Sequence, residues 1–286
     1  MGEFTMKNKI IRLLGVILIS LFTINAIGKT VHVTILHTND FHSHIDPFEK
    51  NAPQNAGEGG MAKRSALIKK IRSESENVLL FDAGDMFQGT PYYNYYKAKL
   101  DFELMTMLGY DGATIGNHEF DNGLEGFESQ LQYAGFPFIN SNYDFYNTIL
   151  YGKILPCKIF EKGGVRIGVY GLGIELKGLV NSNNYGNIRY NDPLQSALII
   201  EEFLKDQHCD LIICLSHLGY EYTNNKVSDK VIAAQTYNTN LIIGGHTHTF
   251  LKQATLVKNK SGKDVVVNQV GFGGLIVGKV DFYLKK

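Results

Sequence analysis

Short apolar runs alternate with amphipathic stretches along most of this chain, and the alternation limits the folds that it can adopt. The runs are of strand length and rich in Ile, Val and Leu, which is typical of strands buried on both faces. They span residues 31–38, 77–85, 112–117, 165–173, 209–219 and 240–248. The pattern predicts an α/β fold in which helices connect buried strands.

The stretches between these runs carry apolar residues at helical spacing. Asp192 followed by Pro193 is a typical helix start, because the aspartate caps the helix and proline fits its first turn. Residues 264–271 and 274–284 instead look like two strands that pair with each other, which predicts an antiparallel part of the sheet. Helices are expected at residues 61–73, 92–108, 124–133, 193–206 and 228–237.

The composition is that of a globular protein without a strongly charged surface. Hydrophobic residues make up 44% of the 286 residues, enough to bury a sizeable core. Lys and Arg together number 28, as do Asp and Glu, so no basic field is available to attract a nucleic-acid polymer. No stretch resembles a linker or a repeat, and residues 29–286 are expected to form one domain.

The N-terminal residues resemble a leader and not part of the fold. Residues 1–5 precede a second Met and are interpreted as vector-derived. Residues 6–28 place Lys and Arg before an apolar stretch and small residues after it, the order found in secretory signal peptides. The alternative, a membrane anchor, needs about 20 apolar residues and is disfavoured. We expect an exported protein, periplasmic or secreted, that is not membrane-bound after cleavage.

Three cysteines are an odd number for an exported protein. Cys209 and Cys214 lie on one apolar run, where an extended strand separates them by about 16 Å, beyond the limit of about 7 Å between the Cα atoms of a disulfide. We expect buried free thiols, and a bridge that involves Cys157 stays open.

Side chains of metal-ligand type follow nearly every apolar run. Strands of an open α/β sheet place their sites at their carboxyl ends, so these side chains are expected in one crevice. The pairs at residues 40 and 42 and at residues 246 and 248 would each lie on one side of an extended backbone. The set is Asp40, His42, Asp85, Asn117, His118, His217, His246 and His248.

Such a cluster implies a metal ion. Buried carboxylates, imidazoles and an amide without partners would each cost on the order of 1 kcal/mol or more. A cation removes that cost. Mixed oxygen and nitrogen ligands suit Zn²⁺, Mn²⁺ or Fe²⁺ better than an ion that prefers thiolates.

Five motifs carry these residues, in the order TNDFHSH (38–44), DAGDMFQGTP (82–91), GNHEFDNG (116–123), SHLG (216–219) and GGHTHT (244–249). Together they resemble the calcineurin-like metallophosphoesterases, and most closely the N-terminal catalytic domain of bacterial 5′-nucleotidases and 2′,3′-cyclic phosphodiesterases. The resemblance covers essentially the whole chain after residue 28. It implies a four-layer α/β/β/α sandwich around two divalent metal ions.

The resemblance also implies a role for each residue of the set. Asp85 would bridge the two metals. His118 would face the phosphate, to stabilise the transition state or protonate the leaving alkoxide, and Asp121 would orient its ring. The first metal would be held by Asp40, His42 and His248, and the second by Asn117, His217 and His246.

Other residues near the motifs receive structural interpretations. Glu119 is expected to make local backbone hydrogen bonds, and His37 to be a structural residue inside its strand. His44 is expected either beside the ligands or on the surface. The aromatic cluster at residues 92–96 favours helix packing over stacking on a base. Arg64 is interpreted as an ordinary basic helix residue, with contact to the phosphate as the alternative.

The sequence therefore predicts an exported two-metal phosphoesterase that acts on 5′-nucleotides or related nucleotides. Two alternatives stay open: a noncatalytic metal-binding subunit of a split nucleotidase, and a sulfur-ester hydrolase of the same superfamily. In the enzymes that the chain resembles, a second domain supplies aromatic stacking for the base. The sequence ends at Lys286, soon after its last expected strand. Either a separately encoded partner supplies that domain, or the substrate is recognised without it.

Overall fold

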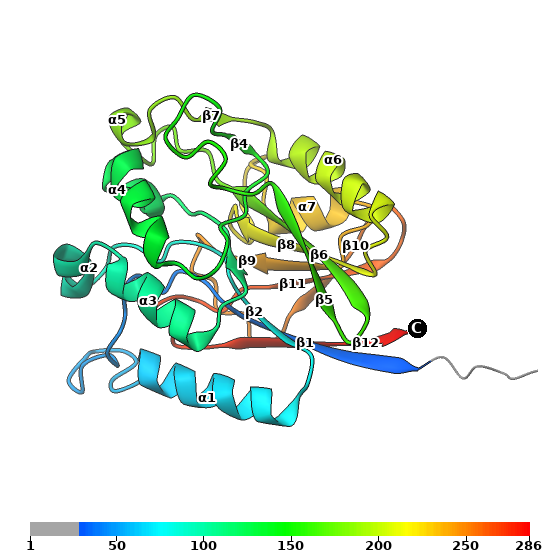
Figure 1. Ribbon diagram of the computed structural model, residues 1–286, viewed down its shortest axis with the longest axis horizontal. Helices are drawn as coiled ribbons and strands as arrows, with labels where there is room; N and C mark the ends of the chain where they lie inside the picture. Colours follow the sequence, from blue (N-terminus) through cyan, green and yellow to red (C-terminus); the bar gives the residue numbers. More distant parts are fainter. Residues whose placement is uncertain (1–28) are drawn as a thin grey trace, which may run out of the picture.

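The computed structural model describes residues 29–286, so the expected vector-derived residues 1–5 and signal peptide 6–28 lie outside the described residues (Figure 1). Within 29–286, no helix combines the length and apolar character needed to cross a membrane. Two β-sheets pack face to face, and helices cover their outer faces. The four-layer α/β/β/α sandwich is therefore confirmed.

The first sheet is mixed. Strand β2 runs parallel to both β1 and β3, whereas β12 runs antiparallel to β1. The order across the sheet is β12 (Gly278–Lys285), β1 (Thr30–Thr38), β2 (Val78–Asp82) and β3 (Gly112–Ala113).

The second sheet has a parallel centre, β6, β8, β9 and β11, with an antiparallel strand at each edge. Its order is β10 (Thr255–Lys258), β11 (Asp264–Asn268), β9 (Leu241–Gly244), β8 (Leu211–His217), β6 (Val165–Gly173) and β5 (Cys157–Lys162). A small separate ribbon pairs β4 (Tyr143–Asp144) with β7 (Arg189–Tyr190).

The continuous apolar runs arise because both faces of each central strand are buried. Successive side chains point to opposite faces of a sheet. In β1, Ile35 packs between the two sheets while Leu36 packs against helices. In β8, Ile213 packs between the sheets while Cys214 faces the helices on the other side.

Helices form the two outer layers (Figure 1). Helices α1, α3 and α4 pack on the first sheet, and α6 and α7 pack on the second. The helices are α1 (Met61–Glu74), α2 (Pro91–Tyr96), α3 (Lys99–Leu108), α4 (Gly123–Gln130), α5 (Ser182–Tyr185), α6 (Pro193–Asp206) and α7 (Asp229–Gln235). Two 3₁₀ turns are η1 (His118–Phe120) and η2 (Leu131–Tyr133).

Two expectations about these elements were wrong. The helix expected at residues 92–108 is divided into α2 and α3, because Lys97 and Ala98 have left-handed φ angles of 52° and 73°. The two C-terminal strands do not pair with each other. Strand β11 joins the second sheet beside β9, while β12 joins the first sheet beside β1.

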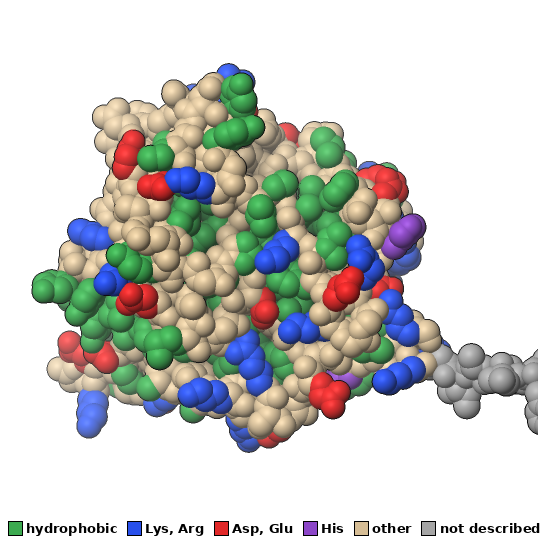
Figure 2. All heavy atoms as spheres, viewed as in Figure 1, with side chains coloured by type: hydrophobic (Ala, Val, Ile, Leu, Met, Phe, Trp, Pro, Cys, Tyr) green, Lys and Arg blue, Asp and Glu red, His purple; other side chains and the backbone are tan. Residues whose placement is uncertain are grey.

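Other local expectations are confirmed. The Asp192 side chain caps α6 by accepting a hydrogen bond from the N–H of Gln195 at 2.8 Å. The three cysteines are free thiols, so no bridge to Cys157 forms. Basic and acidic side chains are interspersed on the face seen in Figure 2, in keeping with the absence of net charge.

Candidate metal centre

Loops from both sheets meet at the carboxyl ends of their strands. The loops after β1 and β2 run side by side, since the N–H of Asp40 donates to Gly84 O at 2.9 Å and that of His42 donates to Asp85 O at 3.2 Å. The loop after β9 joins them, because the N–H of His246 contacts both carboxylate oxygens of Asp40, at 3.0 and 3.1 Å. The expected crevice therefore draws on both sheets.

Asp40, His42 and His248 form a first group, with ligand-type atoms within 4.8 Å of one another. His248 Nε2 lies 3.1 Å from His42 Nε2 and 3.3 Å from Asp40 Oδ1. Asp40 is completely buried, whereas 41% of the His248 side chain is exposed. The first group is thus open to solvent on the His248 side.

Asp85, His217 and His246 form a second group within the same limit of 4.8 Å. His217 Nε2 lies 3.0 Å from Asp85 Oδ2 and 4.0 Å from Asp40 Oδ1, so the two groups adjoin. Asn117 belongs at the second group, because its Oδ1 lies 2.9 Å from His246 Nδ1. The structure therefore brings together every residue expected as a ligand.

Hydrogen bonds leave two imidazole lone pairs facing this centre. His217 Nδ1 donates to Ala83 O at 2.7 Å, and His42 Nδ1 donates to Phe87 O at 3.0 Å. In a neutral ring the other nitrogen, Nε2, is then the lone-pair atom. His217 Nε2 is buried and makes no hydrogen bond of normal geometry. A divalent cation would satisfy these atoms, and the imidazole, carboxylate and amide donors suit Zn²⁺, Mn²⁺ or Fe²⁺.

Charges in the second group shift pKa values in opposite directions. Burial alone would lower the pKa of His217, but the charge of Asp85 outweighs it and raises that pKa to about 10. Burial and the charge of His217 lower the pKa of His246 to about 4. Burial would raise the pKa of Asp85, yet His217 holds it below its ordinary value. The Asp85 carboxylate is therefore an anion that a metal ion can use.

The ligand loops have a left-handed backbone, so the expectation of an extended backbone was wrong, although Asp40 and His42 do lie in one group. The φ angle is 48° at Asp40 and His42, 57° at Asp85, 72° at His246 and 50° at His248. His246 and His248 consequently belong to different groups. Each such residue costs on the order of 1 kcal/mol or more, and this strain persists where surrounding structure fixes it, often at functional sites.

Two glycines next to ligands provide the space that the centre needs. A Cβ atom on Gly116 would lie 2.2 Å from Asp85 Oδ1, and one on Gly245 would lie 2.8 Å from His217 Nδ1. Neither contact is tolerable, so a side chain at either position would displace a residue of the second group. This explains why glycine precedes both Asn117 and His246.

His118 lies beside the second group and is held by a carboxylate. Its Nδ1 lies 2.8 Å from Asp121 Oδ2, and its N–H donates to Asp85 Oδ1 at 2.8 Å. Burial lowers the pKa of the ring, but the Asp121 hydrogen bond and the charge of Asp85 raise it to about 9. The Asp121 carboxylate therefore holds the ring with Nδ1 as the donor.

Glu119 is a structural support for the loop that carries Asp85. Its two buried carboxylate oxygens accept the N–H groups of Asp85 at 3.0 Å, Met86 at 2.7 Å and Gly116 at 2.6 Å. The expected backbone hydrogen bonds are confirmed, although most of them reach the β2 loop and are not local. Glu119 thus holds the loop that positions Asp85 of the second group.

Arg64 is not an ordinary helix residue, and that interpretation was wrong. Its side chain is 3% exposed, and its Cζ lies 5.0 Å from the centre of the Phe41 ring. Phe41 stands between Asp40 and His42 in the chain. Arg64 therefore supports the first ligand loop from inside the protein and does not face a substrate.

Sequence reasoning missed two amide side chains that hold the site. Asn184 Nδ2 donates to the carbonyl oxygen of Asp121 at 2.9 Å. Gln269 accepts from Thr247 Oγ1 at 3.0 Å and donates to Gly245 O, so it fixes the loop that carries His246. Both are single amides outside the motifs, and no pattern in the sequence marks them.

Comparison with known proteins matches the sequence to a family. The family described as calcineurin-like phosphoesterase matches residues 33–250, most of the chain. That span contains both ligand groups and His118 with Asp121.

Similar proteins include several 5′-nucleotidases. The 5′-nucleotidase of Vibrio cholerae serotype O1 is 38% identical over 233 residues, which cover 77% of this chain and 40% of that protein. A snake venom 5′-nucleotidase of Naja atra is 36% identical over 227 residues, 77% of this chain and 41% of the relative. The crystal structure of a 5′-nucleotidase precursor from Thermus thermophilus has a TM-score of 0.80 at 33% identity, over 88% of this chain and 51% of the other. The chain spans about half the length of these proteins, or less.

Proposed function

The chain belongs to the calcineurin-like phosphoesterase family, and we propose that it is an exported two-metal phosphoesterase that hydrolyses 5′-nucleotides or related nucleotides. The resemblance read from the sequence is thereby confirmed at the level of the family. The observation that carries the proposal is the meeting of two adjoining ligand groups beside His118, whose ring Asp121 holds.

In this proposal the two groups hold one divalent ion each. Asp85 would be shared by both ions, as the resemblance implies; its Oδ2 lies 3.0 Å from His217 Nε2, and its Oδ1 accepts the N–H of His118. The ions are Zn²⁺, Mn²⁺ or Fe²⁺, as the mixed donors suggest. The first site comprises Asp40, His42 and His248, and the second Asn117, His217 and His246.

When bound at these residues, two cations would supply a water of lowered pKa and neutralise phosphoryl oxygens. The protein itself contributes orientation and a proton. Asp121 accepts from His118 Nδ1, so Nε2 carries the proton available to the phosphoryl group or to the leaving alkoxide. Asn184 holds the Asp121 backbone, which helps to fix the carboxylate that orients the His118 ring.

Nucleotide substrates are proposed because the relatives are named 5′-nucleotidases, which also favours a phosphate ester over a sulfur ester. The metal groups hold the phosphoryl part, which all such substrates share, so discrimination needs contacts to the leaving group. The relatives are about twice as long, and we propose that a domain outside residues 1–286, in the same protein or in a partner, also contributes to base recognition. Adding such a domain would lower KM for a nucleotide by about tenfold to a hundredfold, the effect of base stacking.

Export is proposed from the leader-like order of residues 6–28, and the similarity to snake venom proteins is in keeping with it. N-terminal sequencing of the protein from cell fractions would test it. A mature N-terminus near residue 28 in the periplasm or medium is expected. An intact N-terminus in the cytoplasm would contradict export.

The activity is tested by phosphate release from AMP and from ribose 5-phosphate, with metal content measured in parallel. We expect hydrolysis that a chelator abolishes and that Mn²⁺ or Zn²⁺ restores. A protein with both metals bound but no turnover on any ester would be the noncatalytic subunit, and the proposal would fail.

A further inference from the structure

The motifs that carry the ligands offer a phosphate ester no lysine or arginine. None of the five motifs contains either residue, and Arg64 is buried beneath Phe41. A phosphate monoester carries up to two negative charges at neutral pH, and a nearby ammonium or guanidinium group would strengthen its binding. Such a group can come only from a segment outside the motifs.

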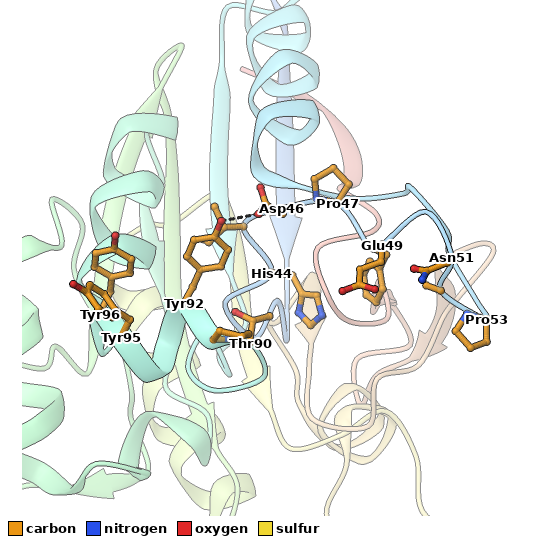
Figure 3. A pocket seen from close by; sticks show the side chains of 14 residues that line it. His44, Asp46, Pro47, Glu49, Asn51, Pro53, Thr90, Tyr92, Tyr95 and Tyr96 are labelled. Atoms are coloured by element: carbon orange, nitrogen blue, oxygen red, sulfur yellow. Dashed lines mark hydrogen bonds between the residues drawn. The ribbon is translucent and has the colours of Figure 1, made fainter.

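The cavity next to the first ligand loop does not supply this group. It has a volume of about 880 Å³ and lies between residues 44–53 and residues 90–96. Its charged groups among the described residues are the carboxylates of Asp46 and Glu49, and Asp46 accepts a hydrogen bond from Tyr92 OH at 2.6 Å (Figure 3). Acidic walls repel a phosphate. A cation that contacts the substrate therefore has to lie on another side of the metal centre.

The loop after β8, residues 218–228, lies against the loop after β9. Tyr220 N–H donates to Thr247 Oγ1 at 3.0 Å, and Thr247 separates the two ligand histidines of that loop in the chain. Asp229 N–H donates to Gly219 O at 2.9 Å, so the two ends of the β8 loop meet. The loop is therefore closed at its base and fixed beside the ligands.

Tyr222 forms a platform within this loop. Its OH donates to Leu218 O at 2.6 Å. A Cβ atom on Gly219 would clash with the Tyr222 hydroxyl oxygen and would lie 2.7 Å from Thr247 Cγ2, so glycine leaves room for the ring against both loops. Lys226 Nζ lies 4.6 Å from the centre of that ring, within the range of a cation–π contact. The ring therefore holds the ammonium group beside the ligand loop.

The charge of Lys226 reaches the second ligand group. Burial and the charge of His217 lower the pKa of His246 most, and the charge of Lys226 adds to them. Burial also lowers the pKa of Lys226 itself, while the carboxylate of Glu175 opposes that effect. Lys226 is exposed, and no carboxylate in the described part of the chain forms an ion pair with it. Its ammonium donors are therefore open to a substrate.

Lys230, at the start of α7, provides a contrast. Its Nζ lies 5.8 Å from the centre of the Tyr220 ring and 2.8 Å from Glu221 Oε1. Both lysines contact a tyrosine ring of the same loop, but the charge of Lys230 is already paired with a carboxylate. Lys230 is thus a matched control for Lys226.

We propose that Lys226 binds the phosphoryl group of the substrate, with its ammonium group donating to a nonbridging oxygen. The proposal rests on the proposed phosphoesterase function, which puts that phosphoryl group at the two ligand groups. It adds a substrate-binding residue from outside the motifs. A lysine suits this task because its three donors sit on a flexible stem and can reach a phosphate from several directions.

Binding is tested with inorganic phosphate as the probe, by calorimetry on the Mn²⁺-loaded protein. Lys226→Gln should raise the Kd of phosphate by about tenfold, the scale of one charge-assisted hydrogen bond. Lys226→Arg, which keeps the charge, should recover part of this loss, and Lys230→Gln should leave the Kd unchanged. Unchanged affinity in Lys226→Gln, or no phosphate binding by the wild type, would overturn the proposal. Loss of metal in Lys226→Gln would indicate a structural role and would overturn it as well.

Catalysis gives a second test. Lys226→Gln should raise KM by about tenfold for both AMP and ribose 5-phosphate, because the two esters share the phosphoryl group, while kcat changes by less than about threefold. Lys230→Gln should leave both constants as in the wild type. A rise in KM for AMP alone would place Lys226 at the leaving group and would contradict the proposal. If neither ester is hydrolysed, the proposed function fails, whereas phosphate binding still decides the role of Lys226.

Discussion

His37 and His217 are both completely buried, yet their surroundings shift their pKa values in opposite directions. His37 lies inside β1, where its Nε2 accepts from Asn268 Nδ2 at 2.9 Å, and burial lowers its pKa to about 4. His217 lies at the end of β8 beside Asp85, which raises its pKa to about 10. Burial alone thus makes a neutral structural histidine. Burial beside carboxylates makes a group that needs a proton or a metal.

The largest expected effect comes from removing Asp85, the carboxylate that distinguishes the surroundings of His217 from those of His37. Asp85→Asn keeps the side-chain shape but removes the charge shared by both groups. We expect loss of bound metal and a fall in kcat by about 10⁴-fold or more, the scale of losing an essential part of a catalytic unit. Metal analysis and phosphate release measure both. Full metal content in Asp85→Asn would show that Asp85 is not a bridging ligand.

His118 lies beside Asp85, but it is proposed to act on the substrate and not to bind a metal. His118→Ala should lower kcat by roughly 10²- to 10⁴-fold, the range for acid–base or electrostatic groups, while metal content stays as in the wild type. Asp121→Asn should have a smaller effect, about 10- to 100-fold, because it orients the ring. Metal loss in His118→Ala would place this residue among the ligands.

The two ligand groups themselves differ in burial, and stability without metal should reveal it. His217→Ala leaves Asp85 as a buried unpaired charge and should cost about 3–5 kcal/mol. His248→Ala, the matched control with its side chain 41% exposed, should cost less than about 1 kcal/mol. Urea unfolding in the presence of a chelator measures both. Equal losses would mean that the second group is not more strongly preorganised than the first.

The smallest effect tests the structural histidine. The pKa of His37 is 6.5 when unfolded and about 4 when folded, so its stabilisation is present above pH 6.5 and is lost as pH falls to about 4. The wild type should lose up to about 1.4 kcal/mol per pH unit more than His37→Gln across this window. Urea unfolding of both proteins between pH 7 and 4.5 gives the difference. Parallel pH profiles would show that His37 does not titrate in this way.

Local patterns in the sequence predicted the central strands of both sheets and the candidate ligands at their ends, whereas the layers followed from the resemblance and strands β4, β5, β7 and β10 were not predicted. Apolar runs mark strands buried on both faces, and the polar residue after each run marks the end of the strand. The family resemblance then supplied the grouping, which spacing alone does not provide. His246 and His248 are two residues apart and yet belong to different groups.

The features that the sequence did not predict depend on contacts between segments that lie far apart in the chain. Arg64 has the pattern of a surface residue, and only the packing of α1 beneath Phe41 buries it. The left-handed residues of the ligand loops follow from hydrogen bonds between loops, such as Asp40 to Gly84. The cavity beside His44 forms where two loops separate, and neither loop alone predicts it.

The pairing of β12 with β1 also determines when the protein can assemble. These strands are in register from Thr30 with Lys285 to His37 with Gly278, so the first strand of the fold depends on the last. During synthesis, β1 emerges early but keeps an unpaired edge until β12 has been made. Pairing so distant in sequence is slow to form. The first sheet should therefore be completed late in folding, after the second sheet has formed its own strand pairs.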